Sequence, residues 1–227
     1  MGQGRPSNPL ALAVLTLLSE RPMHPYEMST ILRERHKEAS IKINYGSLYS
    51  VVESLQRRGL IEARETVREG RRPERTVYAI TTSGERLMVD WLGELLSTPV
   101  KEFPKFEAAL SLMPGLPPDD VVRLLEQRLA SLQDRYETGA RMMDQALAAG
   151  MPRLFGIEHE YEFALLAAEI EFVRNLLDSL RDGSLGGLDW WRRIHELRAT
   201  GLSHEETWAV IRDEFKEDFA WTDDLTE

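Results

Sequence analysis

The sequence predicts a mainly α-helical protein with one small β-hairpin. Apolar residues recur at intervals of three and four along most of the 227-residue chain, which is the period of an amphipathic helix. Between residues 60 and 80 the pattern changes to two β-rich runs on either side of a turn. A proline-rich stretch, residues 99–118, then separates an N-terminal part from a helical C-terminal part.

The composition is that of a globular protein, with 42% hydrophobic and 29% charged residues. Because the chain contains no cysteine, disulfides, thiol catalysis and cysteine-ligated zinc are excluded. The apolar run Leu10–Leu18 is shorter than the roughly 20 residues of a membrane-spanning helix, and it lacks a signal-peptide cleavage site. We therefore expect a cytoplasmic protein with no membrane partner.

Charge is distributed unevenly along the chain. Residues 1–90 contain 14 Lys and Arg against 11 Asp and Glu, a net charge of +3. Residues 91–227 contain 14 against 27, a net charge of −13, so that the whole chain carries −10. Such asymmetry is typical of a nucleic-acid-facing part joined to an acidic body, but chance segregation of charged helix faces gives the same numbers.

The N-terminal part predicts three helices. Asn8 is a good N-cap for a buried helix over residues 9–20, and His24 can cap a second helix from Pro25 to about His36. The third helix, GSLYSVVESLQRR, follows the N-cap candidate Asn44. Its apolar residues repeat at three and four and predict one core-facing stripe: Leu48, Val51, Val52 and Leu55.

A hairpin and a closing helix complete this part. The runs IEARETV and TVYAI flank the turn at residues 69–73, which carries arginines. Thr82 and Glu85 have the spacing of a capping box that begins a helix through about Leu96. Three helices, a hairpin and a further helix predict a winged helix-turn-helix over residues 1–97, in which the third helix enters a DNA major groove.

The C-terminal part predicts helices of very different lengths. A short helix over residues 106–113 precedes a long one that starts at Asp119, and a second long helix covers roughly residues 154–181. The first long helix has a near-heptad apolar stripe: Val121, Leu125, Leu129, Leu132, Tyr136, Met143 and Leu147. The second has its own stripe: Tyr161, Leu165, Ala168, Phe172, Leu176 and Leu180.

Glycines at residues 183–187 end the second long helix. Two shorter helices, residues 190–199 and 205–219, follow, and Ser203 with Glu206 forms a capping box for the latter. We therefore divide the C-terminal part into a helical dimerisation and possible effector domain, residues 98–183, and a helical tail of open role, residues 184–227.

Three sequence blocks resemble the PadR-like family of winged helix-turn-helix transcriptional regulators. They are HPYEM, GSLYSVVESLQRRGLI and GRRPERTVYAITTSGERLM, and residues 106–181 resemble the helical domain of many members. The chain departs from the family pattern with Pro25 for Gly, Ser47 for Thr, and Val77 before Tyr78. The resemblance implies a cytoplasmic homodimer that binds a palindromic operator in double-stranded DNA, commonly as a repressor released by a small molecule.

Candidate DNA-binding residues lie at the start of the third helix and at the hairpin tip. Hydroxyls, backbone N–H groups and the helix dipole suit phosphates and base edges there, whereas a capped surface helix is the bland alternative. Arginines at the tip suit a phosphate backbone or a minor groove, against an ordinary solvated turn. The candidates are Lys42, Asn44, Tyr45, Ser47, Tyr49, Ser50, Arg71, Arg72 and Arg75.

Three aromatic residues, Trp91, Phe103 and Phe106, are candidates for stacking an aromatic or apolar small-molecule effector, although aromatic core is the commoner fate. We expect no cofactor, no metal site and no catalytic residue. His159 with Glu162, and His204 with its neighbouring glutamates, are two-ligand fragments of the kind that arise by chance on charged helices. Phosphate-binding and nucleophile motifs are missing from the sequence, so we do not expect an enzyme.

Two classes of function remain open. The first is a sequence-specific DNA-binding regulator. The second is a helical protein-interaction or adaptor module whose winged helix no longer binds DNA. Salt-dependent duplex binding separates the two classes, because only the first releases counterions from DNA.

Overall fold

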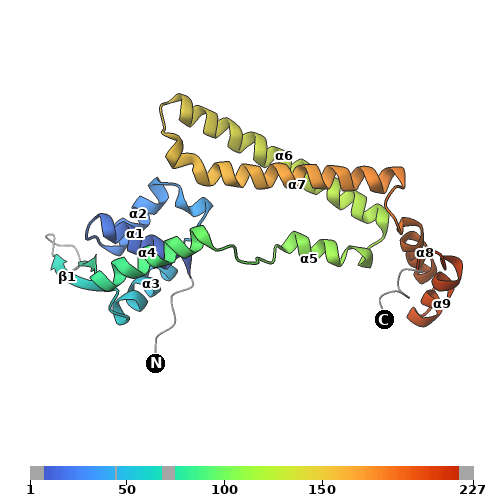
Figure 1. Ribbon diagram of the computed structural model, residues 1–227, viewed down its shortest axis with the longest axis horizontal. Coiled ribbons are helices and arrows are strands. Elements are labelled where there is room, and N and C mark those ends of the chain that lie inside the picture. The colour runs from blue at the N-terminus through green and yellow to red at the C-terminus, as the bar shows by residue number, and fades with distance from the viewer. Residues whose placement is uncertain (1–7, 44, 68–74, 220–227) are drawn as a thin grey trace. The chain divides into compact units, whose positions relative to one another are not determined.

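The computed structural model describes residues 8–43, 45–67 and 75–219 (Figure 1). The chain divides into two compact units, one ending at Lys101 and the other beginning at Glu102. Both are mainly helical, and the described strands form one antiparallel hairpin. This confirms the predicted fold class. The division into domains 1–97, 98–183 and 184–227 stays a prediction.

The first unit has the element order of a winged helix. Its helices and strands are α1 (Pro9–Glu20), α2 (Pro25–Glu34), η1 (Lys37–Ala39), α3 (Tyr45–Arg57), β1 (Ile61–Val67), β2 (Arg75–Ile80) and α4 (Thr82–Ser97). The Asn8 side chain accepts a hydrogen bond from the Leu10 N–H, and His24 Nδ1 accepts one from Tyr26. Both predicted N-caps are therefore confirmed.

Helix α1 forms the centre of the first core. Seven of its twelve residues are buried, and it contacts α3, α4 and β2. From α3, the side chains of Leu48, Val52 and Leu55 pack into the same core and are at most 1% exposed. The predicted apolar stripe of the third helix is thus its buried face, which orients the opposite face towards solvent.

The hairpin is held at its base, next to the helices. Ile61 pairs with Ile80 in the antiparallel ladder, whose register shifts between Ala63 and Glu65. Met23, in the segment between α1 and α2, forms a bridge with Tyr78 through two 3.1 Å backbone hydrogen bonds. These contacts position the hairpin beside α1.

Two predicted details of the first unit were wrong. The N-cap of α4 is Thr81, not Thr82, because the Thr81 hydroxyl accepts the Gly84 N–H while its backbone N–H bonds to Leu60. Tertiary pairing with the end of the hairpin thus selects the first of two threonines. Helix α2 ends at Glu34 rather than His36, whose φ of 54° is left-handed and incompatible with a continuing helix.

The second unit is an antiparallel pair of long helices with shorter helices at one end. Its elements are α5 (Lys105–Ser111), η2 (Met113–Gly115), α6 (Pro118–Ala148), η3 (Arg153–Gly156), α7 (Ile157–Asp182), α8 (Leu188–Ala199) and α9 (His204–Glu214). Three ion pairs join α6 to α7: Arg128–Glu169, Arg135–Glu162 and Arg181–Glu126. The predicted capping box at Ser203 is present, while α9 ends five residues earlier than predicted.

The long helices α6 and α7 bury one face against each other. Val121, Leu125 and Leu132 of α6 meet a row of α7 residues of which only Leu180 belongs to the predicted stripe: Leu166, Val173, Leu177 and Leu180. Most of the predicted α7 stripe lies on the opposite face, where Tyr161 is 67% exposed and Phe172 is 49% exposed. Helix α7 is therefore apolar on two faces, only one of which α6 covers.

The tail packs partly on this pair and partly on itself. Leu188 and Trp191 of α8 join the α6–α7 core, whereas Ile194, Leu197 and Ile211 form a smaller cluster between α8 and α9. Arg193 donates two hydrogen bonds to Glu214, of 2.8 and 3.0 Å, which lowers the pKa of the Glu214 carboxyl. The tail is thus a continuation of the second unit.

The close packing of α4 on the hairpin yields a stability prediction. A Cβ added at Gly84 would lie 2.1 Å from the Leu60 carbonyl oxygen, so Gly84→Ala should destabilise the protein by about 1–3 kcal/mol. Gly93, in the same helix, has nothing within 4 Å, and Gly93→Ala should stabilise it by roughly 0.5–1 kcal/mol. Urea unfolding followed by circular dichroism should therefore shift in opposite directions, and equal shifts would contradict this packing.

Candidate nucleic-acid interface

The solvent-facing side of α3 is polar from the N-terminal end of the helix onward. Because Leu48, Val52 and Leu55 turn inward, residues three and four positions apart on the other side are exposed. These include Gly46, Tyr49, Ser50 and Glu53. The helix therefore presents one continuous face to which a groove of a nucleic acid could dock.

Two of the predicted contact residues sit on this face with their groups accessible. The Tyr49 side chain is 43% exposed. The Ser50 hydroxyl donates a 3.0 Å hydrogen bond to the Gly46 carbonyl, and its oxygen keeps the capacity to accept another. Lys42, just before the helix, is exposed, and Ser47 is half-buried. The structure thus gathers these four residues around the start of α3.

The remaining predicted contacts fall partly or wholly outside the described residues. Asn44, Arg71 and Arg72 lie outside them. For Tyr45 and Arg75 the structure describes only the backbone, which begins α3 and β2 respectively. Their assignment to DNA stays a prediction.

The structure also shows α3 residues that the sequence analysis did not single out. Glu53, Gln56 and Arg57 continue the exposed face of Tyr49, and Arg57 lies 3.8 Å from Glu53 in an ion pair. Counting three and four residues on from Tyr49 would have identified them. The Glu53 carboxylate would repel phosphates, so this end of the face is less suited to a DNA backbone than its N-terminal end.

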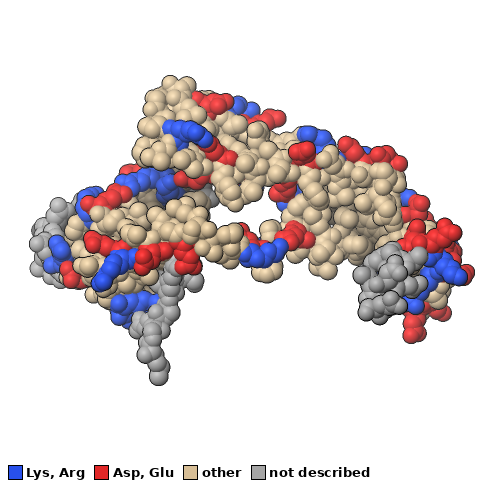
Figure 2. Space-filling view, in the orientation of Figure 1, with Lys and Arg blue, Asp and Glu red and all other residues tan. Residues whose placement is uncertain are grey.

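Charged residues of both signs are interleaved on the visible face of the first unit (Figure 2). Arg35 hydrogen-bonds to both carboxylate oxygens of Glu20, which lowers the pKa of Glu20, and Arg21 pairs with Glu27. These arginines of the α1–α2 region are engaged within the protein. The net +3 of residues 1–90 is therefore not a uniform basic surface.

The three candidate effector residues occupy different environments. Trp91 is 5% exposed and packs in the core of the first unit, and Phe103 is 84% exposed. Phe106 belongs to the second unit, where its ring meets Phe172 edge-on at 6.4 Å between centroids. The Arg128 guanidinium lies 3.7 Å above the same ring. Effector binding by these residues stays a prediction.

The histidine–glutamate fragments are engaged in other contacts. Glu162 pairs with Arg135 at 2.9 Å, and Glu206 completes the capping box at Ser203. His204 meets the Trp208 ring edge-on, with 6.2 Å between ring centroids. Within the part of the chain that the structure describes, no group of three His, Asp or Glu side chains could hold a metal ion.

Residues 14–90 match the model of the transcriptional regulator PadR-like family. This match covers α1 from Val14, α2, α3, the hairpin and most of α4. It confirms the resemblance that the three sequence blocks indicated. No curated protein matched the chain by sequence.

Solved structures of regulators share the fold. PadR of Bacillus subtilis in complex with operator DNA has a TM-score of 0.61 and 18% identity, over 77% of this chain and 99% of that one. The same protein with p-coumaric acid has a TM-score of 0.60 and 15% identity, over 76% and 98%. The Vibrio cholerae virulence activator AphA has a TM-score of 0.58 and 16% identity, also over 76% and 98%.

Over the three described ranges, no helix combines the length and the apolar character needed to cross a bilayer.

The exposed face of α3 generates a binding prediction. Tyr49→Ala and Ser50→Ala should each weaken binding to a specific duplex by about 1–3 kcal/mol if a base contact is lost, with a smaller effect on random sequence. Ser131→Ala is a matched control, because the Ser131 hydroxyl on α6 makes the same bond to the carbonyl four residues earlier. Fluorescence anisotropy with labelled duplexes measures the difference. Equal affinities for all variants would remove α3 from the interface.

Proposed function

We propose that this chain, whose residues 14–90 are those of a PadR-like transcriptional regulator, binds a specific operator in double-stranded DNA as a homodimer and represses transcription. The observation that carries the proposal is the exposed polar face at the start of α3, on a winged helix that matches this family. The adaptor alternative has no such observation in its favour.

Helix α3 is the proposed recognition helix. Its N-terminal residues would contact base edges in the major groove while α2 lies across the backbone, as in other helix-turn-helix proteins. The positive end of the helix dipole and the side chains around it, Lys42, Tyr49 and Ser50, suit phosphate and base acceptors. The arginines at the hairpin tip would add contacts to the backbone or the minor groove.

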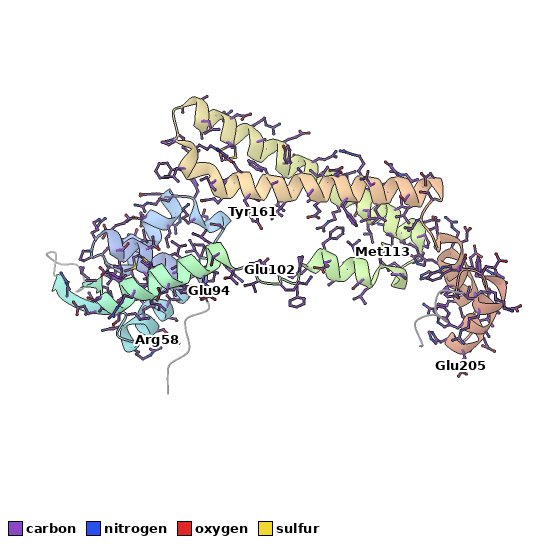
Figure 3. The ribbon with its side chains drawn as sticks, in the orientation of Figure 1. Arg58, Glu94, Glu102, Met113, Tyr161 and Glu205 are labelled. Atoms are coloured by element: carbon purple, nitrogen blue, oxygen red, sulfur yellow. The ribbon has the colours of Figure 1, made fainter. Side chains whose placement is uncertain are left out.

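The uncovered face of α7 supports a homodimer. Ile157, Tyr161 and Leu165 are each more than half exposed, and they lie on the side of the helix away from α6. Figure 3 shows Tyr161 projecting from that side. An apolar stripe of this kind on an exposed protein surface marks an interaction site. A symmetric pairing of two copies is the commonest way to cover it.

A dimer explains the distribution of charge. A single winged helix with a net charge of +3 would bind DNA weakly, whereas two held at a fixed separation gain a high effective concentration. The acidic remainder, with −13, would be repelled by phosphates and so would favour orientations that turn the winged helices to the duplex.

We further propose release from DNA by an aromatic or apolar small molecule. Phe103, in the segment between α4 and α5, offers an exposed aromatic surface on which a planar ring could stack. A molecule bound there would act on the connection between the two units. The cytoplasm is the proposed location.

Salt dependence tests the proposal against the adaptor alternative. The affinity of the full chain for a duplex should fall linearly on a log–log plot against salt concentration, since each neutralised phosphate releases counterions. Arg72→Ala should weaken binding to all sequences alike and reduce the slope by about one. Binding titrations at several salt concentrations measure both effects, and a wild-type protein without salt-sensitive duplex binding would exclude the regulator.

Assembly gives a second test. Light scattering should report about twice the 26.0 kDa chain mass for the wild type. Leu165→Glu should yield monomers, because it places a charge in the proposed interface. Ala167→Glu adds the same charge on the exposed flank of α7 and should stay dimeric. If Leu165→Glu is still a dimer, the interface lies elsewhere.

A further inference from the structure

The connection between α5 and α6 has carbonyl groups that its own backbone cannot satisfy. We call residues Leu112–Pro118 the elbow. In a helical turn the Pro114 carbonyl would accept from the residue three or four positions on, but these are Pro117 and Pro118, which have no N–H group. A donor for this carbonyl therefore comes either from water or from another part of the chain.

Helix α8 of the tail supplies donors to the elbow. The Trp191 indole N–H donates a 2.9 Å hydrogen bond to the Leu116 carbonyl, and His195 Nε2 lies 2.9 Å from the Pro114 carbonyl. Since a carbonyl can only accept, the hydrogen in the second bond lies on Nε2. The two side chains are four residues apart on one face of α8, and Trp191 is 4% exposed. Figure 3 shows Met113 of the elbow beside the tail.

Helix α5 depends on contacts at its two ends. It has seven residues, none of them buried. Near its start, the Phe106 ring contacts Phe172 of α7 and Arg128 of α6, and Arg128 is held in turn by a 2.6 Å hydrogen bond to Glu169. The elbow follows the C-terminal end of α5. The Arg128–Phe106 contact near the start of α5 and the α8 contacts to the elbow after its end thus hold α5 on the α6–α7 pair.

We propose that the tail is a brace for the DNA-binding function, in which Trp191 and His195 are positioning residues that hold the elbow and thereby fix α5. The inference rests on the proposed function. Because the segment from Thr98 to Pro104 joins the winged helix to α5, the position of α5 sets where each winged helix is attached to the proposed dimer. A fixed attachment restricts the dimer to one spacing of half-sites, and a loose one lowers the effective concentration of the second winged helix.

The first experiment measures the brace itself. Because the chain has no cysteine, Ser111→Cys on α5 and Ser131→Cys on α6, both exposed, permit two spin labels without background labelling. Double electron–electron resonance, on labelled protein diluted with unlabelled protein, should give a narrow distance distribution for this parent. Trp191→Phe and His195→Ala should broaden it.

Two further variants separate positioning from general damage. His195→Gln offers an amide N–H to the Pro114 carbonyl and should restore the narrow distribution. Trp208→Phe alters the packing between α8 and α9 within the tail, away from the elbow, and should leave the distribution narrow. If Trp191→Phe and His195→Ala also stay narrow, α8 does not hold the elbow and the inference is wrong.

The second experiment measures the consequence for DNA, with duplexes that carry two half-sites at varied spacing. Trp191→Phe should lower the affinity for the best spacing about tenfold, within the roughly 10²–10⁴ that tethering can provide, and should flatten the preference for spacing. Affinity for a single half-site and the mass of the dimer should not change. If the distance distribution broadens but the spacing profile is unaltered, the link to DNA is refuted. A parent that binds no duplex refutes the proposed function instead, and the resonance data still decide whether α8 holds the elbow.

Discussion

The burial of α1 is the constraint on which the winged helix depends. Seven of its twelve side chains are removed from water by α3, α4 and β2 together, which leaves those elements little freedom to move independently. The orientation of α3 follows from this packing. Leu48 and Val52 face α1, so Tyr49 and Ser50 have to face solvent. The candidate DNA-contacting surface is therefore a consequence of the core.

The second unit shows a different use of apolar surface. Helix α7 covers α6 with one face and leaves Ile157, Tyr161 and Leu165 of a second apolar face exposed. Exposed apolar surface of this kind is stable in water only with a further partner or at the cost of solubility. The ion pairs of Arg128, Arg135 and Arg181 with α7 or α6 flank the covered face and favour one register between the helices. Packing inside the unit and the proposed assembly between copies thus involve separate sides of the same helix.

Prolines determine the backbone structure of the elbow. They prevent α5 and α6 from forming one helix, and they leave the Pro114 carbonyl without a local backbone donor, so that His195 of α8 can bond to it. The tail is thereby tied to the connection between α5 and α6 within the second unit. Pro117 and Pro118 thus both interrupt the helix and leave the Pro114 carbonyl to which His195 bonds.

Local signals in the sequence determined most of the elements. Asn8, His24 and the Ser203–Glu206 box mark helix starts through bonds to backbone N–H groups two or three residues away, and the apolar period of residues 48–55 identifies the buried face of α3. The family blocks identified the winged helix because they combine these local signals in a fixed order. Each of these inferences needs only residues that are close in the chain.

Tertiary structure decided what depends on residues that are far apart in the chain. Thr81 rather than Thr82 caps α4 because its N–H bonds to Leu60 across the end of the hairpin. Two apolar stripes run along α7, and only contact with α6 determines that Leu166 and Val173 are inside while Tyr161 is outside. Trp191 and His195 reach the elbow across 75 and 81 residues of sequence. Periodicity reveals that a helix has an apolar face, but it does not reveal which partner covers that face.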